Sequence, residues 1–152
     1  MTETMPKARV AAASDAWESM LRAYHLLNGR FSQDGPWDRA SMREYDIMYT
    51  LAKAGCALSQ NELLSSVNLS QPAVSRMLKR MEAKGLVARR PSLEDGRSSQ
   101  IELTETGRQL QRQMGREHGK QVAAALTERL TEEEIANLQE LCDKLSKDQV
   151  NE

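Results

Sequence analysis

Apolar side chains recur at three- and four-residue spacing along most of the chain, a period that predicts amphipathic helices. Six segments show this spacing: residues 14–31, 41–55, 59–67, 70–84, 104–130 and 131–145. After Gly85 the pattern becomes strand-like, because the apolar stretches 86–87 and 101–103 flank the polar segment PSLEDGRSSQ. The Asp95-Gly96 pair within it favours a tight turn. The chain is therefore predicted to be mainly α, with one small two-stranded β-hairpin.

Serine and threonine mark the positions where several of these helices begin. Three starts, at Ser41, Ser59 and Thr131, have glutamate three residues later, which is the pattern of a capping box. The start at Ser70 has Ala73 at that position instead. A carboxylate there would strengthen the cap but repel phosphate, whereas the bare amino end of a helix attracts it. The first turn after Ser70 is thus predicted to face an anion, and chance absence of the carboxylate is the alternative.

The segment 70–84 has two different faces. Four apolar residues lie on one side and four polar or small residues on the other: Val74, Met77, Leu78 and Met81 against Pro72, Ser75, Arg76 and Lys79. The order helix, short helix, tight turn, helix, hairpin is typical of a winged helix-turn-helix, with residues 91–100 as the wing. Gln71 can pair with an adenine edge, and Arg76 with guanine or phosphate. The segment is therefore predicted to enter the major groove of DNA.

The net charge of −1 hides two regions of opposite sign. Residues 70–100 have seven basic and three acidic side chains, a net charge of +4, whereas residues 117–152 have a net charge of −5. A basic middle region favours an anionic partner, although a basic run by itself is also typical of a solvated surface.

The sequence does not support several other classes of protein. The longest apolar run, residues 122–126, is far shorter than the ~20 residues of a membrane helix, and no signal core follows Lys7 and Arg9, so a cytoplasmic location is expected. No catalytic grouping, phosphate loop or metal-ligand cluster is visible, which predicts no enzyme, no metal and no other cofactor. Cys56 and Cys142 suit neither a disulfide framework nor zinc, and they are predicted to be small buried apolar residues.

Three strings follow one another after Ser41: SQNELLSSVNLSQPAVSRMLKRMEAKGLVARR, EDGR and IELTETG. Together they resemble the MarR (multiple antibiotic resistance regulator) family from Ser41 to about Leu110. The resemblance implies an obligate homodimer that binds an inverted repeat of double-stranded DNA. Residues 41–104 would form the winged helix-turn-helix, and residues 10–34 with 105–149 a helical dimerisation region. The expected function is a ligand-responsive transcriptional repressor that a small-molecule effector releases from its operator.

The resemblance also implies the residues that contact DNA. The family's base-reading positions match seven residues of this chain: Ser70, Gln71, Pro72, Ala73, Ser75, Arg76 and Lys79. Its minor-groove arginine matches Arg97, and Ser59 and Asn61 are expected to contact phosphates. Asp95 is predicted to orient the wing by holding Arg97 or Arg89. Gly96 departs from the family pattern, because many members have a second wing arginine there.

Members of the family often bind a small molecule between the dimerisation helices and the DNA-binding lobe. Seven residues are candidates to line such a crevice: Trp17, Met20, Tyr24, His25, Trp37, Tyr45 and Met48. The alternative is that these side chains form ordinary core. Peroxide-sensing members of the family use a cysteine in the first helix, and this chain has none there. A redox-responsive regulator would therefore have to use Cys56 or Cys142. A winged-helix module that binds protein would favour acids or exposed hydrophobic residues where segment 70–84 has serine, arginine and lysine.

Overall fold

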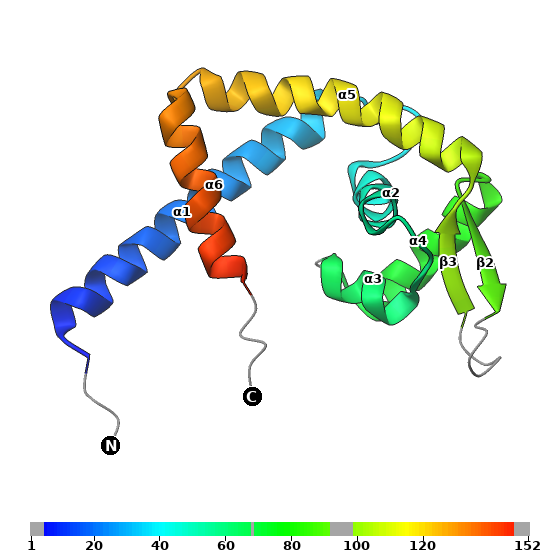
Figure 1. Cartoon of the computed structure of the whole chain (residues 1–152), viewed down its shortest axis with the longest axis horizontal. Helices are drawn as coiled ribbons and strands as arrows, with labels where there is room; N and C mark the ends of the chain where they lie inside the picture. The colour runs from blue at the N-terminus through cyan, green and yellow to red at the C-terminus, as the bar shows by residue number, and fades with distance from the viewer. Residues whose placement is uncertain (1–4, 68, 92–98, 148–152) are drawn as a thin grey trace. The chain divides into compact units, whose positions relative to one another are not determined.

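The computed structural model describes residues 5–67, 69–91 and 99–147. Its elements, in chain order, are α1 (Lys7–Asp34), α2 (Met42–Ala54), β1 (Leu58–Ser59), α3 (Gln60–Ser66), α4 (Gln71–Ala83), β2 (Val87–Pro91), β3 (Ser99–Leu103), α5 (Glu105–Thr127) and α6 (Glu132–Ser146) (Figure 1). The predicted mainly helical fold with a small hairpin is confirmed.

The chain divides into two compact units, which are described separately. We call Gly35–Gly119 the lobe, and the stretches that end at Asp34 and begin at Lys120 the terminal unit. The lobe includes the amino-terminal part of α5, because Leu110 and Met114 are buried in its core. Helix α5 therefore contributes residues to both units.

Local hydrogen bonds define the helix ends that the capping patterns predicted. Ser41, Ser59 and Thr131 each form a complete capping box with the glutamate three residues later. Gly55 and Gly85 follow helices with φ of 67° and 71°, a left-handed conformation that glycine adopts without steric cost. Helix α1 is longer than the predicted 14–31, because residues 7–13 and 32–34 also belong to it.

The sheet has one strand more than the hairpin pattern predicted. Its order is β1-β3-β2, and all pairs are antiparallel. Ile101 of β3 lies opposite Leu58 of β1 on one side and Arg89 of β2 on the other. Strand β1 has only two residues, and a segment that short has no measurable period in the sequence. The wing is thus joined at its base to the chain just before α3.

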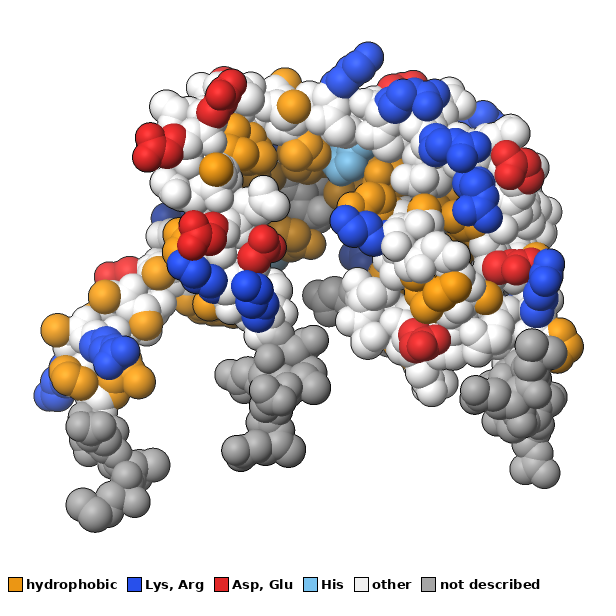
Figure 2. Space-filling view, viewed as in Figure 1, with side chains coloured by type: hydrophobic (Ala, Val, Ile, Leu, Met, Phe, Trp, Pro, Cys, Tyr) orange, Lys and Arg blue, Asp and Glu red, His pale blue; other side chains and the backbone are white. Residues whose placement is uncertain are grey.

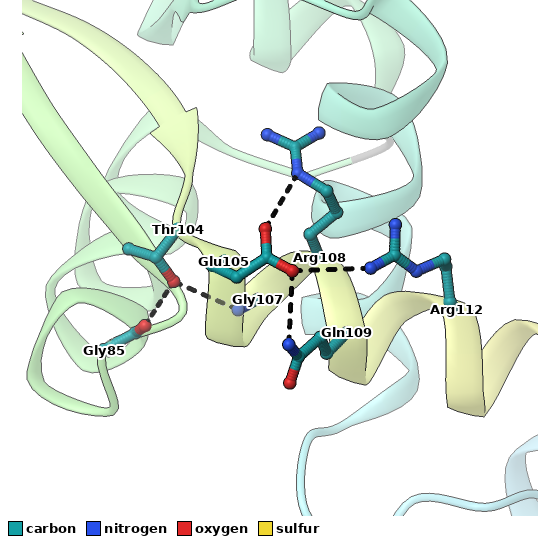
Figure 3. A network of polar contacts seen from close by, with 7 residues as sticks. All are labelled: Gly85, Thr104, Glu105, Gly107, Arg108, Gln109 and Arg112. Carbon is teal, nitrogen blue, oxygen red and sulfur yellow. Dashed lines mark hydrogen bonds and ion pairs between the residues drawn. The ribbon is translucent and has the colours of Figure 1, made fainter.

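The hydrophobic core of the lobe fixes the positions of its helices. Its largest fully buried side chains come from α2, α3, α4 and β3: Ile47, Met48, Leu63, Val74, Leu78, Met81 and Ile101. The start of α5 is fastened to the turn after α4, because the Thr104 hydroxyl donates to the Gly85 carbonyl and accepts from the Gly107 N–H (Figure 3). A Cβ on Gly107 would lie 2.0 Å from the Leu86 carbonyl oxygen, so this close approach requires glycine.

Candidate nucleic-acid interface

Helix α4 presents its polar face to the outside of the lobe. Val74, Met77, Leu78 and Met81 are all buried, as the period predicted. The predicted base-reading residues divide into an exposed and a half-buried group: Gln71, Pro72, Arg76 and Lys79 are exposed with the cap residue Ser70, and Ala73 and Ser75 are half-buried. The structure therefore brings these seven residues together on one helix and its cap, with apolar packing behind them.

The amino end of α4 differs from those of α2, α3 and α6. The Ser70 hydroxyl accepts from the Ala73 N–H at 3.4 Å, and no acidic residue lies in the first turn. Pro72 lacks an N–H group and lies where that group would have no partner within the helix. The positive end of the helix dipole is thus left without a carboxylate, which suits a phosphate group.

The first turn of α3 holds the two residues predicted to contact phosphates. The Ser59 N–H donates to Glu62 Oε2 at 2.6 Å, and the Ser59 hydroxyl accepts from the Glu62 N–H at 3.2 Å. Hydrogen bonds from the Ser59 backbone N–H and from the Ser59 side chain lower the pKa of Glu62, because both favour the carboxylate. The Ser59 side chain is thus engaged with Glu62, so a phosphate contact by this residue stays a prediction. Asn61 is exposed beside it, with an amide N–H that can donate to a phosphate oxygen.

The strands of the wing are tied to α4 and to each other. The Arg89 guanidinium on β2 donates to Glu82 Oε2 of α4 at 3.0 Å and to the Ser99 hydroxyl of β3 at 3.2 Å. Arg90 and Glu102 form a cross-strand ion pair at 2.6 Å. Arg89 therefore anchors the base of the wing, and Glu82 is a partner that the sequence pattern did not reveal. The predicted wing residues Asp95 and Arg97 lie outside the described residues.

An aromatic cluster in the lobe contains two of the predicted effector residues. The rings of Trp37 and Tyr45 are 5.6 Å apart, and His118 lies 5.4 Å from the first and 5.7 Å from the second. We call these three residues the aromatic cluster. His118 was not predicted, because it is far along the chain from the other two and only folding brings them together. Burial raises the pKa of the Tyr45 hydroxyl, against the opposing effect of a hydrogen bond with Gln111.

The pKa of Asp46 beside this cluster is also raised. Desolvation of its carboxyl raises the pKa, and the charges of His118 and Arg43 act in the opposite direction. Such groups can interact with a polar substituent on a ligand ring.

The remaining five effector candidates lie outside the aromatic cluster. Met48 is fully buried in the lobe core, where it packs with other hydrophobic residues. The other four belong to α1 in the terminal unit and are exposed: Trp17, Met20, Tyr24 and His25.

Both cysteines are exposed, so the prediction that they are buried is wrong. Cys56 follows Gly55 in the turn after α2, and Cys142 lies on α6, of which no described residue is buried. Among the residues that the structure describes, no group of histidine, cysteine and carboxylate side chains is arranged to hold a metal ion. None of the helices in the described ranges is long and apolar enough to cross a membrane.

Comparisons with known proteins show which family the chain belongs to. Residues 40–99 match the family model MarR, described as the MarR family. Over 120 residues the chain is 30% identical to the multiple antibiotic resistance protein MarR of Salmonella typhimurium. The aligned region covers 79% of this chain and 80% of that protein. The chain belongs to the MarR family. The resemblance predicted from the sequence strings is thereby confirmed.

Two solved structures are similar to this MarR-family chain. A mutant MarR from Escherichia coli, in complex with operator DNA, has a TM-score of 0.69 and 25% identity, and the match covers 84% of this chain and 94% of that one. BpsR of Bordetella bronchiseptica, whose DNA binding is regulated by 6-hydroxynicotinic acid, has a TM-score of 0.75 and 22% identity, with 88% and 99% covered. The second likeness concerns the fold alone. The chain is a DNA-binding transcriptional regulator of the MarR family.

Proposed function

We propose that the protein is a repressor that binds an inverted-repeat operator as a homodimer and is released by a small aromatic effector. The observation that carries the proposal is the outer face of α4. It presents Arg76 and Lys79 with small polar residues at its amino end, and no acidic side chain lies in its first turn. A helix with this distribution of charge meets the phosphate backbone and base edges of DNA favourably.

Binding as a homodimer is supported by the apolar side chains of the terminal unit. Leu138, Leu141 and Leu145 of α6 are 43%, 58% and 76% exposed. Hydrophobic side chains also lie at the surface of α1 (Figure 2), where no described residue is buried. A second copy of the chain would cover such surfaces, and two-fold symmetry would present two α4 helices to two half-sites about one helical turn apart.

Selection of bound duplexes from a random DNA pool tests the DNA part of the proposal. We expect the purified protein, at near-physiological salt, to enrich an inverted repeat. Arg76→Ala should weaken operator binding by about 1–3 kcal/mol and relax the base preference, because the guanidinium would no longer reach a base edge or phosphate. Arg116→Ala on α5 removes another exposed arginine and is the matched control.

The result that overturns this part is the absence of any enriched sequence, or an unchanged affinity and base preference in Arg76→Ala. Either result would favour the alternative of a winged-helix module that binds a protein partner.

The aromatic cluster supports a planar aromatic effector. Trp37, Tyr45 and His118 offer ring faces together with polar tips, and a flat ligand can stack on such faces. BpsR has a similar fold, and its DNA binding is regulated by 6-hydroxynicotinic acid, which is a ligand of this planar aromatic class. The chain has two tryptophans, so Trp17→Phe leaves Trp37 as the sole tryptophan reporter.

We expect 6-hydroxynicotinic acid or a related aromatic acid to quench Trp37 fluorescence in Trp17→Phe and to weaken operator binding. His118→Ala should reduce both effects together. Lack of both effects across a panel of aromatic acids would contradict this effector class. Release by peroxide that is lost in Cys56→Ser or Cys142→Ser would instead favour the redox-responsive alternative, which the exposure of both cysteines supports.

A further inference from the structure

A buried carboxylate joins the beginning of α2 to the end of α4. Glu44 is only 2% exposed, although it belongs to the first turn of its helix. Its Oε2 accepts from the Ser41 N–H at 2.9 Å. Both of its oxygens also accept from Lys84 Nζ, at 3.1 Å for Oε1 and 2.9 Å for Oε2. Lys84 is the residue that caps the carboxyl end of α4.

Helix capping does not explain why this carboxylate is buried. Glu62 and Glu134 complete the same capping box at α3 and α6 while they remain exposed. A buried carboxylate is costly unless an opposite charge and hydrogen bonds compensate it. At Glu44 the compensation comes from a residue 40 positions away on another helix. The feature that distinguishes Glu44 from the other capping glutamates is therefore its bond to the end of α4.

We propose that Glu44 is a positioning residue for DNA recognition, which acts by holding Lys84 and thereby the tilt of α4. This inference rests on the proposed function of α4 as the DNA-reading helix. The 13 residues of α4 span about 20 Å, so a tilt of about 5° at the Lys84 end moves the amino end by about 1.7 Å. Productive contacts tolerate only about 0.5 Å of displacement, so a change of that size disrupts base readout.

The same turn of α2 also reaches the aromatic cluster. Tyr45 directly follows Glu44, and its ring lies against Trp37 and His118. A ligand that displaced the Tyr45 ring would act on the helical turn that also bears Glu44, and the proposed positioning of α4 would then respond to the effector.

The test measures the binding of the full-length protein to its selected operator and to a scrambled duplex. Glu44→Gln keeps the size of the side chain and an oxygen that can cap α2, but removes the charge. Lys84→Met removes the partner charge, and Lys84→Arg keeps it. Glu105→Gln is the matched control, because that carboxylate pairs with Arg108 and Arg112 on the exposed surface of α5 (Figure 3).

We expect Glu44→Gln and Lys84→Met each to lower operator affinity at least tenfold, with less than threefold change on the scrambled duplex. The double variant should bind as either single variant does, because both changes remove one interaction. Lys84→Arg and Glu105→Gln should bind within threefold of the wild type. All affinities are measured at a temperature at which circular dichroism shows each variant folded.

Three results would overturn the inference. Unchanged operator affinity in folded Glu44→Gln, or in folded Lys84→Met if Glu44→Gln does not fold, would show that the pair only stabilises the lobe. Equal losses on both duplexes in Lys84→Met alone would show that Lys84 contacts phosphate directly. Effects that add in the double variant would mean that the two residues act separately. A wild type without sequence preference would instead reject the proposed function, and the inference with it.

Discussion

At position 73, helix stability would favour a glutamate, whereas the proposed DNA binding favours a neutral residue such as Ala73. In α2, α3 and α6 the third helical residue is a glutamate that closes a capping box, whereas α4 has only the Ser70 hydroxyl on the Ala73 N–H at 3.4 Å. A glutamate at this position would complete the cap and would place a negative charge at the amino end of α4. The small neutral side chain is therefore explained by the proposed anionic partner and not by the helix itself.

Ala73→Glu should weaken operator binding by about 1–3 kcal/mol while the protein remains at least as stable as the wild type. The loss arises because the new carboxylate repels phosphate at the amino end of α4. Ala73→Gln is the matched control, since glutamine can also close the capping box but has no charge. Fluorescence anisotropy with operator DNA and thermal unfolding followed by circular dichroism make the measurement. Equal binding by the two variants would contradict the proposed role of this turn.

At the scale of elements, the packing of α5 on the turn after α4 determines where the lobe ends. The Thr104 hydroxyl bridges the Gly85 carbonyl and the Gly107 N–H, and Leu110 and Met114 enter the core (Figure 3). Lys and Arg side chains lie along the amino-terminal half of α5 (Figure 2), so few apolar positions hold this half of the helix in place. The close approach at Gly107 is therefore an important contact for the element.

Gly107→Ala should lower the free energy of unfolding by about 3 kcal/mol or more. A Cβ there would lie 2.0 Å from the Leu86 carbonyl oxygen, so the backbone would have to move and the Thr104 bridge would weaken. Gly119→Ala is the matched control on the same helix, because its Cβ would meet no atom within 4 Å. We expect Gly119→Ala to raise stability by about 0.5–1 kcal/mol through helix propensity. Urea unfolding at fixed protein concentration distinguishes the two, and similar stabilities would contradict the assigned contact.

At the scale of the whole molecule, the two units differ in how they bury apolar surface. The lobe has a continuous core, whereas α1 and α6 have no buried residue among those described. Ala125 of α5 is buried within the terminal unit, but several large apolar side chains of α1 and α6 remain exposed. Large exposed apolar side chains gathered in one unit are typical of an interaction site. The lobe can thus be expected to fold around its own core, whereas the proposed homodimer would cover the apolar side chains of the terminal unit.

Leu141→Lys should dissociate the proposed homodimer, because it places a charge at a leucine on the apolar stripe of α6. Operator affinity should then fall by at least tenfold, since a monomer reads a single half-site. Gln139→Lys adds the same charge at an exposed polar position of α6 and should leave the dimer intact. Sedimentation velocity measures the assembly directly. A Leu141→Lys protein that remains dimeric would rule out this helix face as the interface.

Local chemistry made several features of this protein predictable from its sequence. The capping boxes at Ser41, Ser59 and Thr131 and the buried face of α4 depend on residues three or four positions apart, and a sequence displays such spacings directly. The winged helix-turn-helix order followed from the same spacings, whereas the MarR family was indicated by the resemblance of three sequence strings. The outer face of α4 was likewise predictable, because once one face of a helix is buried its opposite face must be exposed.

Contacts between distant segments were decided by the tertiary structure alone. Strand β1 exists because Leu58 and Ser59 pair with a strand about 40 residues later in the chain, and two residues have no period of their own. The same holds for Lys84 on Glu44, for Arg89 on Glu82 across a turn, and for His118 between Trp37 and Tyr45. The sequence determined the capped helix starts and the buried face of α4, because those properties arise from near neighbours. Only the folded chain decided which charges and rings meet, because their positions depend on how the elements pack.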